Sequence, residues 1–167
     1  QIYQNIVEIS RSKIFYVDLE LDDNFETRFD LVIFHAFMIF YFYKVNSDNK
    51  SKIPQELFDY MFSDFENNLR EMGFGDIAVN KKMKKFINAF YGRIANYSKG
   101  VDLIQQKKSD EILNLAISNN IYKGKVSNDM HISFFKQYII RNLDFFNSRD
   151  LKKNINERFR LIDFPLE

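Results

Sequence analysis

The chain of 167 residues contains no cysteine. Disulfide bonds, thiolate metal ligands and a cysteine nucleophile are therefore excluded, and the composition fits a reducing compartment. Tryptophan is also absent, and there are only two prolines and five glycines. Because so few residues break regular structure, the sequence favours long helices without an internal repeat or a low-complexity linker.

Excess charge of one sign is also missing, since 24 Lys and Arg stand against 23 Asp and Glu and give a net charge of +1. A balance so near neutral gives no support for DNA as a partner. Hydrophobic residues make up 46% and charged residues 28% of the chain, which is typical of a folded globular protein. The length suits one domain, so residues 1–167 are expected to form a single all-helical unit.

Aromatic residues are abundant, with 19 Phe and 9 Tyr. Lys, Asn, Ile and Phe all have codons rich in A and T, so the phenylalanine count indicates a genome rich in A and T rather than an aromatic binding surface. Phenylalanine side chains nevertheless bury large areas, and the sequence therefore predicts a core rich in Phe.

Apolar residues recur mainly at helical spacing, which predicts an all-α bundle of about six or seven helices. Residues 14–21 alternate instead and could be extended, and Asp22, Asp23 and Asn24 offer an N-cap for the helix that follows. The alternating residues 159–164 predict a C-terminal tail that lies partly extended across the bundle. The helices are expected over about residues 3–10, 25–45, 54–72, 77–98, 110–119 and 129–146.

The run from Leu31 to Tyr43 is apolar on nearly every side of its helix. Such a helix lies either at the centre of a bundle or against a membrane. Its 13 residues reach only about 20 Å, whereas a membrane span needs about 20 residues. We therefore expect a buried central helix and no transmembrane span, with contact at a membrane surface as the alternative.

Side chains that could together form a catalytic or metal site are scarce. His35 and His131 lie far apart in the sequence without metal-ligand spacing, and neither a nucleophile elbow nor a phosphate-binding loop is present. Gly73 and Gly75 lack the third glycine and the preceding strand of a dinucleotide fingerprint. The sequence therefore predicts no enzyme activity, no metal and no cofactor.

Two glycines mark a corner between the third and fourth expected helices. Gly73 and Gly75 allow a sharp turn, and Asp76 is a plausible N-cap for the next helix. A simple tight turn explains these residues. The alternative is that the corner holds Arg70 and Glu71 in place to meet a partner.

The helix after this corner carries four lysines, Lys81, Lys82, Lys84 and Lys85. At 100° per residue they cover an arc of about 160°, opposite an apolar face. The preceding helix is acidic, so an acidic helix lies beside a basic one. An ordinary solvated face explains the lysines, and the alternative is an anionic partner, namely ribosomal RNA, an acidic protein or lipid headgroups.

Gly92 falls on the lysine side of the same helix, where glycine costs about 1 kcal/mol relative to alanine. We therefore expect this chain or a partner to approach that turn closely, and a fully exposed Gly92 with nothing near it would contradict both versions. Earlier in the chain, Arg28 and His35 are seven residues apart and share a helix face. His35 is expected to be buried and hydrogen-bonded, with recognition or pH sensing as the alternative.

The chain resembles the ubiquinol–cytochrome c chaperone family through the order and spacing of its motifs from about residue 3 to residue 97. Asn120-Ile121-Tyr122 and Phe164-Pro165 fit more weakly, and Phe74 stands where the family usually has a smaller aliphatic residue. The run from Arg70 to Asp76 is specific. The matching residues are Arg28-Phe29-Asp30 with His35, Gln55-Glu56-Leu57-Phe58-Asp59, Leu69-Arg70-Glu71-Met72-Gly73-Phe74-Gly75-Asp76, and Met83-Lys84 with Phe90-Tyr91-Gly92-Arg93 and Tyr97.

The resemblance implies an assembly factor for respiratory complex III. Mitochondrial members bind newly made cytochrome b near the ribosomal exit, together with a second small assembly factor, until haem and the first partner subunits arrive. The match follows the bacterial pattern, which implies the bacterial cytoplasm with contact at the inner membrane, or the mitochondrial matrix if the chain is eukaryotic. A holdase of this kind needs an exposed apolar groove, for which side chains near Tyr91 and Tyr97 are candidates. The residues expected to contact partners are Arg70, Glu71, Lys81, Lys82, Lys84, Lys85, Tyr91, Arg93 and Tyr97.

Two other functions stay open at this level. The first is a helical adaptor that binds the ribosome or another protein through the basic helix face, which strong salt dependence would favour. The second is a bundle that binds haem or quinone, with His35 as the axial ligand. A pocket beside His35 would support that function, and tight packing around His35 would count against it.

Overall fold

The computed structural model describes residues 1–46, 51–125, 128–148 and 159–164. Within these ranges the chain forms seven helices and no strand, which confirms the all-α prediction. The helices are α1 (Ile2–Ser10), α2 (Lys13–Tyr16), α3 (Phe25–Asn46), α4 (Ile53–Glu71), α5 (Asp76–Gln105), α6 (Glu111–Asn120) and α7 (Asp129–Ser148).

Helix α3 is the centre of the bundle. Every residue from Phe29 to Ile39 is buried, and α1, α4, α5 and α7 all contact the helix. Among the described residues α3 is also the one helix long and apolar enough to cross a membrane, but 72% of its most apolar window is buried inside the protein. A core helix passes the same test, so the expectation of a buried central helix is confirmed.

The start of α3 is capped as predicted, whereas the preceding segment differs from expectation. The Thr27 N–H donates to Oδ1 of Asn24 at 2.9 Å, which is an N-cap hydrogen bond. Residues 13–16 form the single turn α2, so the extended alternative is wrong there. Phe15 and Leu19, four residues apart, are both fully buried, and this helical spacing outweighs the local alternation.

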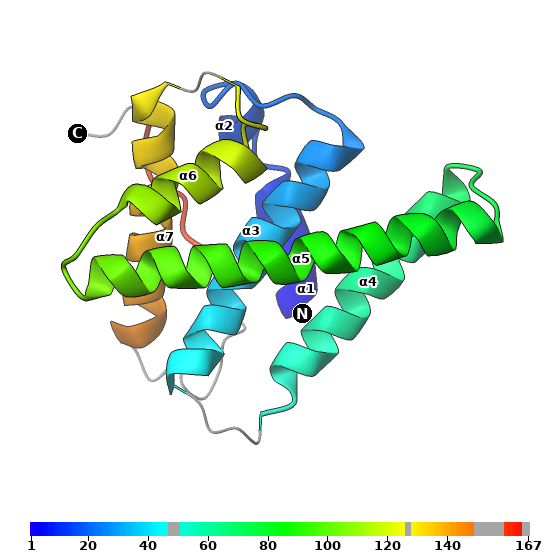
Figure 1. Ribbon diagram of the computed structural model, residues 1–167, viewed down its shortest axis with the longest axis horizontal. Helices are drawn as coiled ribbons and strands as arrows, with labels where there is room; N and C mark the ends of the chain where they lie inside the picture. The colour runs from blue at the N-terminus through cyan, green and yellow to red at the C-terminus, as the bar shows by residue number, and fades with distance from the viewer. Residues whose placement is uncertain (47–50, 126–127, 149–158, 165–167) are drawn as a thin grey trace.

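Helices α4 and α5 form a long antiparallel hairpin whose tip lies away from the other helices (Figure 1). Gly73 adopts a positive φ of 94°, and the Phe74 N–H donates to the Leu69 carbonyl at 3.2 Å, so the predicted tight turn is confirmed. The N-cap position is Gly75 rather than Asp76. Asp76 is already helical, and its carboxylate accepts a hydrogen bond from Arg70 across the corner.

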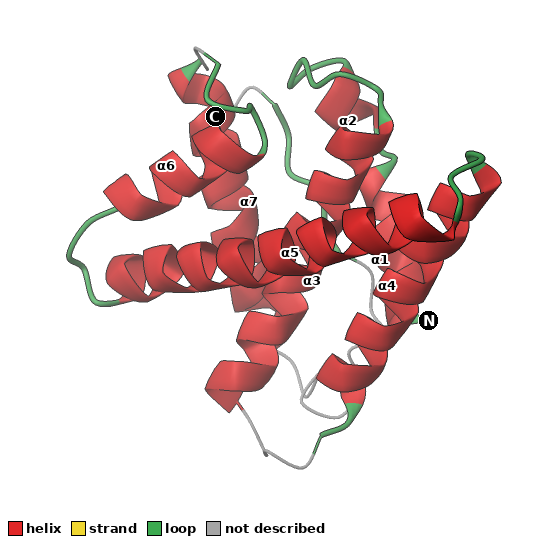
Figure 2. Cartoon of the chain, turned by 45° about the vertical axis from the view of Figure 1, so that its right-hand side comes forward, coloured by secondary structure: helices red, strands yellow, loops and turns green. Residues whose placement is uncertain are grey.

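Helix α5 continues to Gln105, well beyond the expected end at Ser98. Gly100 lies in this extension, where α6 packs directly against the helix. A Cβ atom at Gly100 would lie 2.8 Å from Cα of Leu113, closer than side chains tolerate. The glycine therefore allows α5 and α6 to approach closely, and the two helices lie side by side in both views (Figures 1 and 2).

The core is rich in aromatic rings, as predicted. Phe15 stacks on Phe135 with ring centres 6.0 Å apart, and Phe34 meets Phe135 edge to face at 5.3 Å. The described part of the tail joins this core without forming a helix. Phe159 is buried 5.1 Å from the His35 ring, and the Arg160 N–H donates to Oδ1 of Asn142 on α7 at 2.9 Å.

Candidate functional groove

The surface is hollowed along α1 and α4. Two cavities of about 410 and 430 Å³ adjoin here and share Tyr3 as a lining residue. We call them together the α1–α4 groove. Its first cavity is lined by Tyr3, Val7, Ser10, Arg11, Phe25, Arg28, Phe29, Val32, Asp64, Phe65, Asn68, Glu71 and Met72, and its second by Gln1, Ile2, Tyr3, Gln4, Ile53, Glu56, Leu57 and Tyr60.

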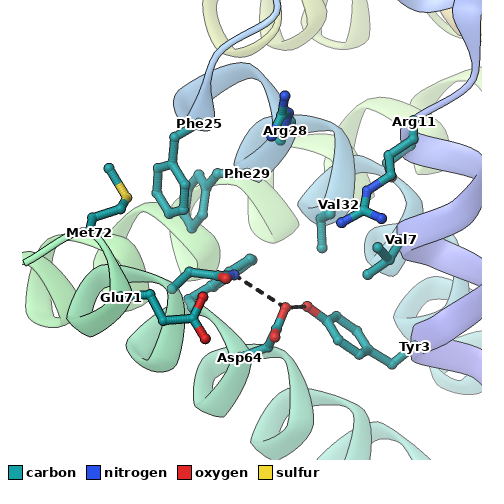
Figure 3. A pocket seen from close by; sticks show the side chains of 13 residues that line it. Tyr3, Val7, Arg11, Phe25, Arg28, Phe29, Val32, Asp64, Glu71 and Met72 are labelled. Carbon is teal, nitrogen blue, oxygen red and sulfur yellow. Dashed lines mark hydrogen bonds between the residues drawn. The ribbon is translucent and has the colours of Figure 1, made fainter.

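The groove has an apolar floor supplied by α3 and α4. Phe29, Val32 and Phe65 are buried beneath it, and the ring centres of Phe29 and Phe65 are 4.9 Å apart. Met72 at one end and Tyr60 at the other remain 57% and 70% exposed. Figure 3 shows Phe25, Phe29 and Met72 together on one side of the first cavity. The exposed apolar side chains can accept an apolar segment without moving the core.

The polar side of the groove is held by Tyr3 and Asp64. The Tyr3 hydroxyl donates a short hydrogen bond to Asp64, which joins α1 to α4 across the groove (Figure 3). Burial and the neighbouring Asp64 carboxylate raise the pKa of Tyr3, so it stays a neutral hydrogen-bond donor. Arg11 and Arg28 lie on the opposite side of the first cavity, where Arg28 also pairs with Asp23 at 2.7 Å.

Only two of the predicted site residues, Arg28 and Glu71, line this groove. Arg70 lies at the corner beside it, where its guanidinium pairs with Glu66 at 3.1 Å and Asp76 at 2.5 Å. These pairs make Arg70 part of the turn. The sequence analysis missed Tyr3 and Met72, since nothing in a linear pattern shows that α1 lies against α4.

The four predicted lysines lie on the outside of α5. Lys81, Lys84 and Lys85 are exposed, and Lys82 is half-buried with its Nζ 4.7 Å from the ring centre of Phe74. Tyr91 on the same helix is 59% exposed and stacks against Phe58 of α4, with ring centres 5.9 Å apart. These residues form a surface separate from the groove, because no residue of α5 lines either cavity.

Tyr97 is in the core, so its expected role on an exposed surface is wrong. It is 1% exposed and packs between Phe34 and Phe37, at 5.8 and 5.3 Å between ring centres. Tyr97 lies seven residues after Phe90, which is also buried, and this helical spacing places both side chains on the inner face of α5.

Arg93 is also turned inward, which corrects its expected role at the surface. Its guanidinium and the Lys123 ammonium both pair with the carboxylate of Asp30, whose side chain is 2% exposed. Burial lowers the pKa of both cations. We call these three residues the Asp30 cluster. It ties α3 to α5 and to the segment that follows α6, and a buried carboxylate requires partners of this kind.

Gly92 is exposed, and a Cβ atom placed there would meet nothing within 4 Å. The expected close approach at Gly92 is therefore wrong in both of its versions. The close approach occurs instead at Gly100, which lies beyond the end that the sequence predicted for this helix.

His35 is fully buried and hydrogen-bonded on both ring nitrogens, as expected. Nδ1 lies 2.7 Å from the Leu31 carbonyl oxygen, so it carries the proton and donates, and Nε2 accepts from the Tyr138 hydroxyl at 2.8 Å. Burial lowers the pKa of His35 to about 4. Such tight packing counts against His35 as an axial haem ligand. Arg28, in contrast, is exposed at the start of α3.

No group of three His, Asp or Glu side chains within the described ranges could hold a metal ion. The polar groups that the sequence singled out are engaged in structural contacts or exposed on a helix surface, and the groove beside them combines an apolar floor with polar side chains around it. The arrangement is an all-helical fold with a surface groove that a partner segment can enter.

The chain belongs to the ubiquinol–cytochrome C chaperone family, because the sequence model of that family matches residues 17–161. It is 23% identical over 154 residues to the human ubiquinol–cytochrome c reductase complex assembly factor 1, covering 90% of this chain and 50% of that protein. The mouse protein of the same name is 22% identical over 163 residues, covering 96% of this chain and 54% of its own length. The chain thus spans about half the length of the curated relatives it matches.

A solved structure has the same fold. The crystal structure of the Cbp3 homolog from Brucella abortus matches with a TM-score of 0.79 and 26% sequence identity, over 97% of this chain and 87% of that one. The likeness to a bacterial structure supports the interpretation of this chain as a bacterial-type member of the family.

Proposed function

We propose that this protein is a non-enzymatic assembly chaperone for respiratory complex III, and that its client is newly made cytochrome b. Family membership supports the assembly role, since the curated relatives are named assembly factors of the ubiquinol–cytochrome c reductase complex. The α1–α4 groove is the observation that carries the client role. A holdase needs an exposed apolar surface to compete with aggregation of its client, and the groove provides one on a rigid scaffold.

The groove suits a single apolar segment rather than a whole folded partner. Its two cavities of about 410 and 430 Å³ adjoin along α1 and α4, so a helical or extended segment can lie lengthwise over Tyr3. Met72 provides a flexible apolar contact at one end, and Glu71 and Arg11 provide polar contacts at its rim. A second small assembly factor and the ribosome are further proposed partners, and the proposed location is the bacterial cytoplasm next to the inner membrane.

A site-specific crosslink tests this function. A photoreactive amino acid is placed at Met72 in the groove or at Met130 on α7, two methionines that are 57% and 50% exposed. During translation of cytochrome b in cells, we expect a crosslink to the new chain from position 72 and little or none from position 130. Equal crosslinking from both positions, or none from position 72, would contradict the groove as the client site.

A charged substitution gives the matching loss of function. Met72→Glu places a carboxylate over Phe25 and Phe29, and an apolar segment that covers it must desolvate the charge. We expect the affinity for the client segment to fall about tenfold or more, which corresponds to the loss of roughly 1.4 kcal/mol of binding free energy, and cytochrome b to accumulate at a reduced level. Met130→Glu is the control and should leave accumulation unchanged.

A further inference from the structure

The outer face of α5 carries positive charge without any acidic residue. From Ile77 to Val101 the helix contains five lysines and one arginine and no Asp or Glu. Asp76 just before this stretch pairs with Arg70, and Asp102 just after it accepts a hydrogen bond from Tyr41. The positive charge along this stretch is therefore not balanced by carboxylates of the same helix.

Four of these cations are available to a partner. Lys81, Lys84, Lys85 and Lys99 are exposed, and none forms an ion pair within the described part of the chain. At 100° per residue they fall within an arc of about 100° on α5. Lys82 and Arg93 are different, because Lys82 covers Phe74 and Arg93 belongs to the Asp30 cluster.

Two exposed apolar side chains accompany the four lysines. Ile77 is 75% exposed and Tyr91 is 59% exposed, and both lie within about 80° of Lys81 around the helix axis. We call Ile77, Lys81, Lys84, Lys85, Tyr91 and Lys99 the α5 face. Its length from Ile77 to Lys99 is about 33 Å at 1.5 Å per residue.

Helix α5 lies on one side of the molecule. The helix runs along the longest axis of the molecule, across the front of the other helices (Figure 1). Helix α4 beside it is acidic, with Glu56, Asp59, Asp64, Glu66 and Glu71, so the charges of the two neighbouring helices differ in sign.

We propose that the α5 face docks this protein onto the surface of a membrane that contains anionic lipids. Lysines gain free energy near anionic headgroups, and tyrosine is enriched at the interface of bilayers. The exposed Ile77 and Tyr91 favour a bilayer over RNA, which would offer phosphates but no apolar layer. The docking does not depend on the proposed client, because the α5 face contributes no residue to the α1–α4 groove.

Vesicle sedimentation tests the charge dependence. The purified chain is mixed with vesicles of phosphatidylcholine alone or of equal parts phosphatidylcholine and phosphatidylglycerol. We expect binding to the anionic vesicles only, and a loss of binding at high salt. Replacing Lys81, Lys84, Lys85 and Lys99 with Gln should weaken binding by about a hundredfold or more, at roughly fivefold per lysine.

A matched control separates position from total charge. Lys13, Lys44, Lys52 and Lys125 also carry four charges, and none lies on α5. Replacing these four with Gln should leave vesicle binding within about a factor of a few of the original protein. Equal losses in both variants, or no binding of the original protein to anionic vesicles, would overturn the proposal. Tighter binding to RNA than to vesicles through the same lysines would overturn it as well.

Because the chain contains no tryptophan, a single introduced tryptophan reports whether its position enters the bilayer. Tyr91→Trp introduces a single tryptophan on the α5 face, and Tyr60→Trp introduces one on α4, where Tyr60 is 70% exposed. On anionic vesicles we expect the fluorescence of the first variant to shift to shorter wavelength and that of the second to stay unchanged. A shift in both variants or in neither would contradict docking through α5.

Discussion

His35 shows how one buried side chain links the core to pH. Its ring is enclosed by Phe15, Phe34 and Phe159, and both nitrogens are hydrogen-bonded. A protonated ring could not keep the hydrogen bond that Nε2 accepts from Tyr138, because both nitrogens would then be donors. The native protein therefore holds His35 in its neutral form.

The pKa of His35 predicts a loss of stability in mild acid. Burial lowers it to about 4 from its ordinary value of 6.5, so between these values the unfolded chain binds more protons than the folded one. The stability that neutral His35 contributes is fully present above about pH 6.5, and it is lost as the pH falls from there toward about 4. Between about pH 7 and about pH 5 we expect the free energy of unfolding to drop by about 2 kcal/mol from this group.

Urea unfolding at both pH values measures this drop, and His35→Gln is the reference variant. Glutamine can still donate and accept hydrogen bonds but does not titrate, so the pH-dependent part should disappear even if the variant is less stable overall. An equal drop in the variant would show that other groups cause the acid sensitivity.

The two glycines of α5 give opposite predictions for the same substitution. Gly92→Ala adds a methyl group in open space on a helix and should raise the free energy of unfolding by about 1 kcal/mol. Gly100→Ala places its Cβ 2.8 Å from the backbone of Leu113 and should lower the free energy of unfolding by about 1–3 kcal/mol. Denaturant titrations of the two variants measure both changes. Changes of the same sign would contradict the packing of α6 on Gly100.

At the scale of the helices, the Asp30 cluster joins segments that are distant in the sequence. Asp30 is on α3, Arg93 on α5 and Lys123 just after α6. The two cations are not equivalent, because the Arg93 side chain is 18% exposed and that of Lys123 is 38% exposed. Water screens the second pair more than the first.

The difference in exposure predicts a difference in stability. Arg93→Met should lower the free energy of unfolding by about 3 kcal/mol, since it leaves the buried Asp30 with one partially exposed partner. Lys123→Met should cost about 1 kcal/mol or less. Chemical denaturation of both variants at neutral pH provides the comparison. Equal costs would show that burial does not decide the strength of these pairs.

The positions of α3 and α4 were predictable because their patterns are strong. The apolar run in α3 predicted a central helix, and helical spacing together with Gly73 predicted where α4 begins and ends. The partners of charged groups were harder to predict. Asp30 at the edge of an apolar run must find a cation, but periodicity does not identify Arg93, which lies between the inner and outer faces of α5.

At the scale of the whole molecule, the candidate groove could not be predicted from the sequence. Its lining combines α1, the first half of α3 and α4, and these come together only through tertiary packing. Short helices such as α1 carry no signal of where they dock. Tyr97 is a different case, since its seven-residue spacing from the buried Phe90 is itself a signal that Tyr97 lies on the inner face of α5.

The groove and the α5 face are made from different residues, and this separation predicts independent effects. With a photoreactive residue at Tyr60 and a translation extract free of membranes, Met72→Glu should reduce crosslinks to new cytochrome b. The variant with Gln at Lys81, Lys84, Lys85 and Lys99 should crosslink like the original protein. On anionic vesicles, Met72→Glu should bind like the original protein, because it keeps every lysine of the α5 face. The variant with four Gln should bind these vesicles weakly.

Combining the two changes tests the separation most strictly. The combined variant should lose crosslinking and vesicle binding, each to the extent seen in the corresponding single variant, because sites without shared partners act additively. A loss of crosslinking in the lysine variant without membranes would place the α5 face inside the client interface. In that case the lysines would contact cytochrome b itself, and the groove would be only part of a larger binding surface.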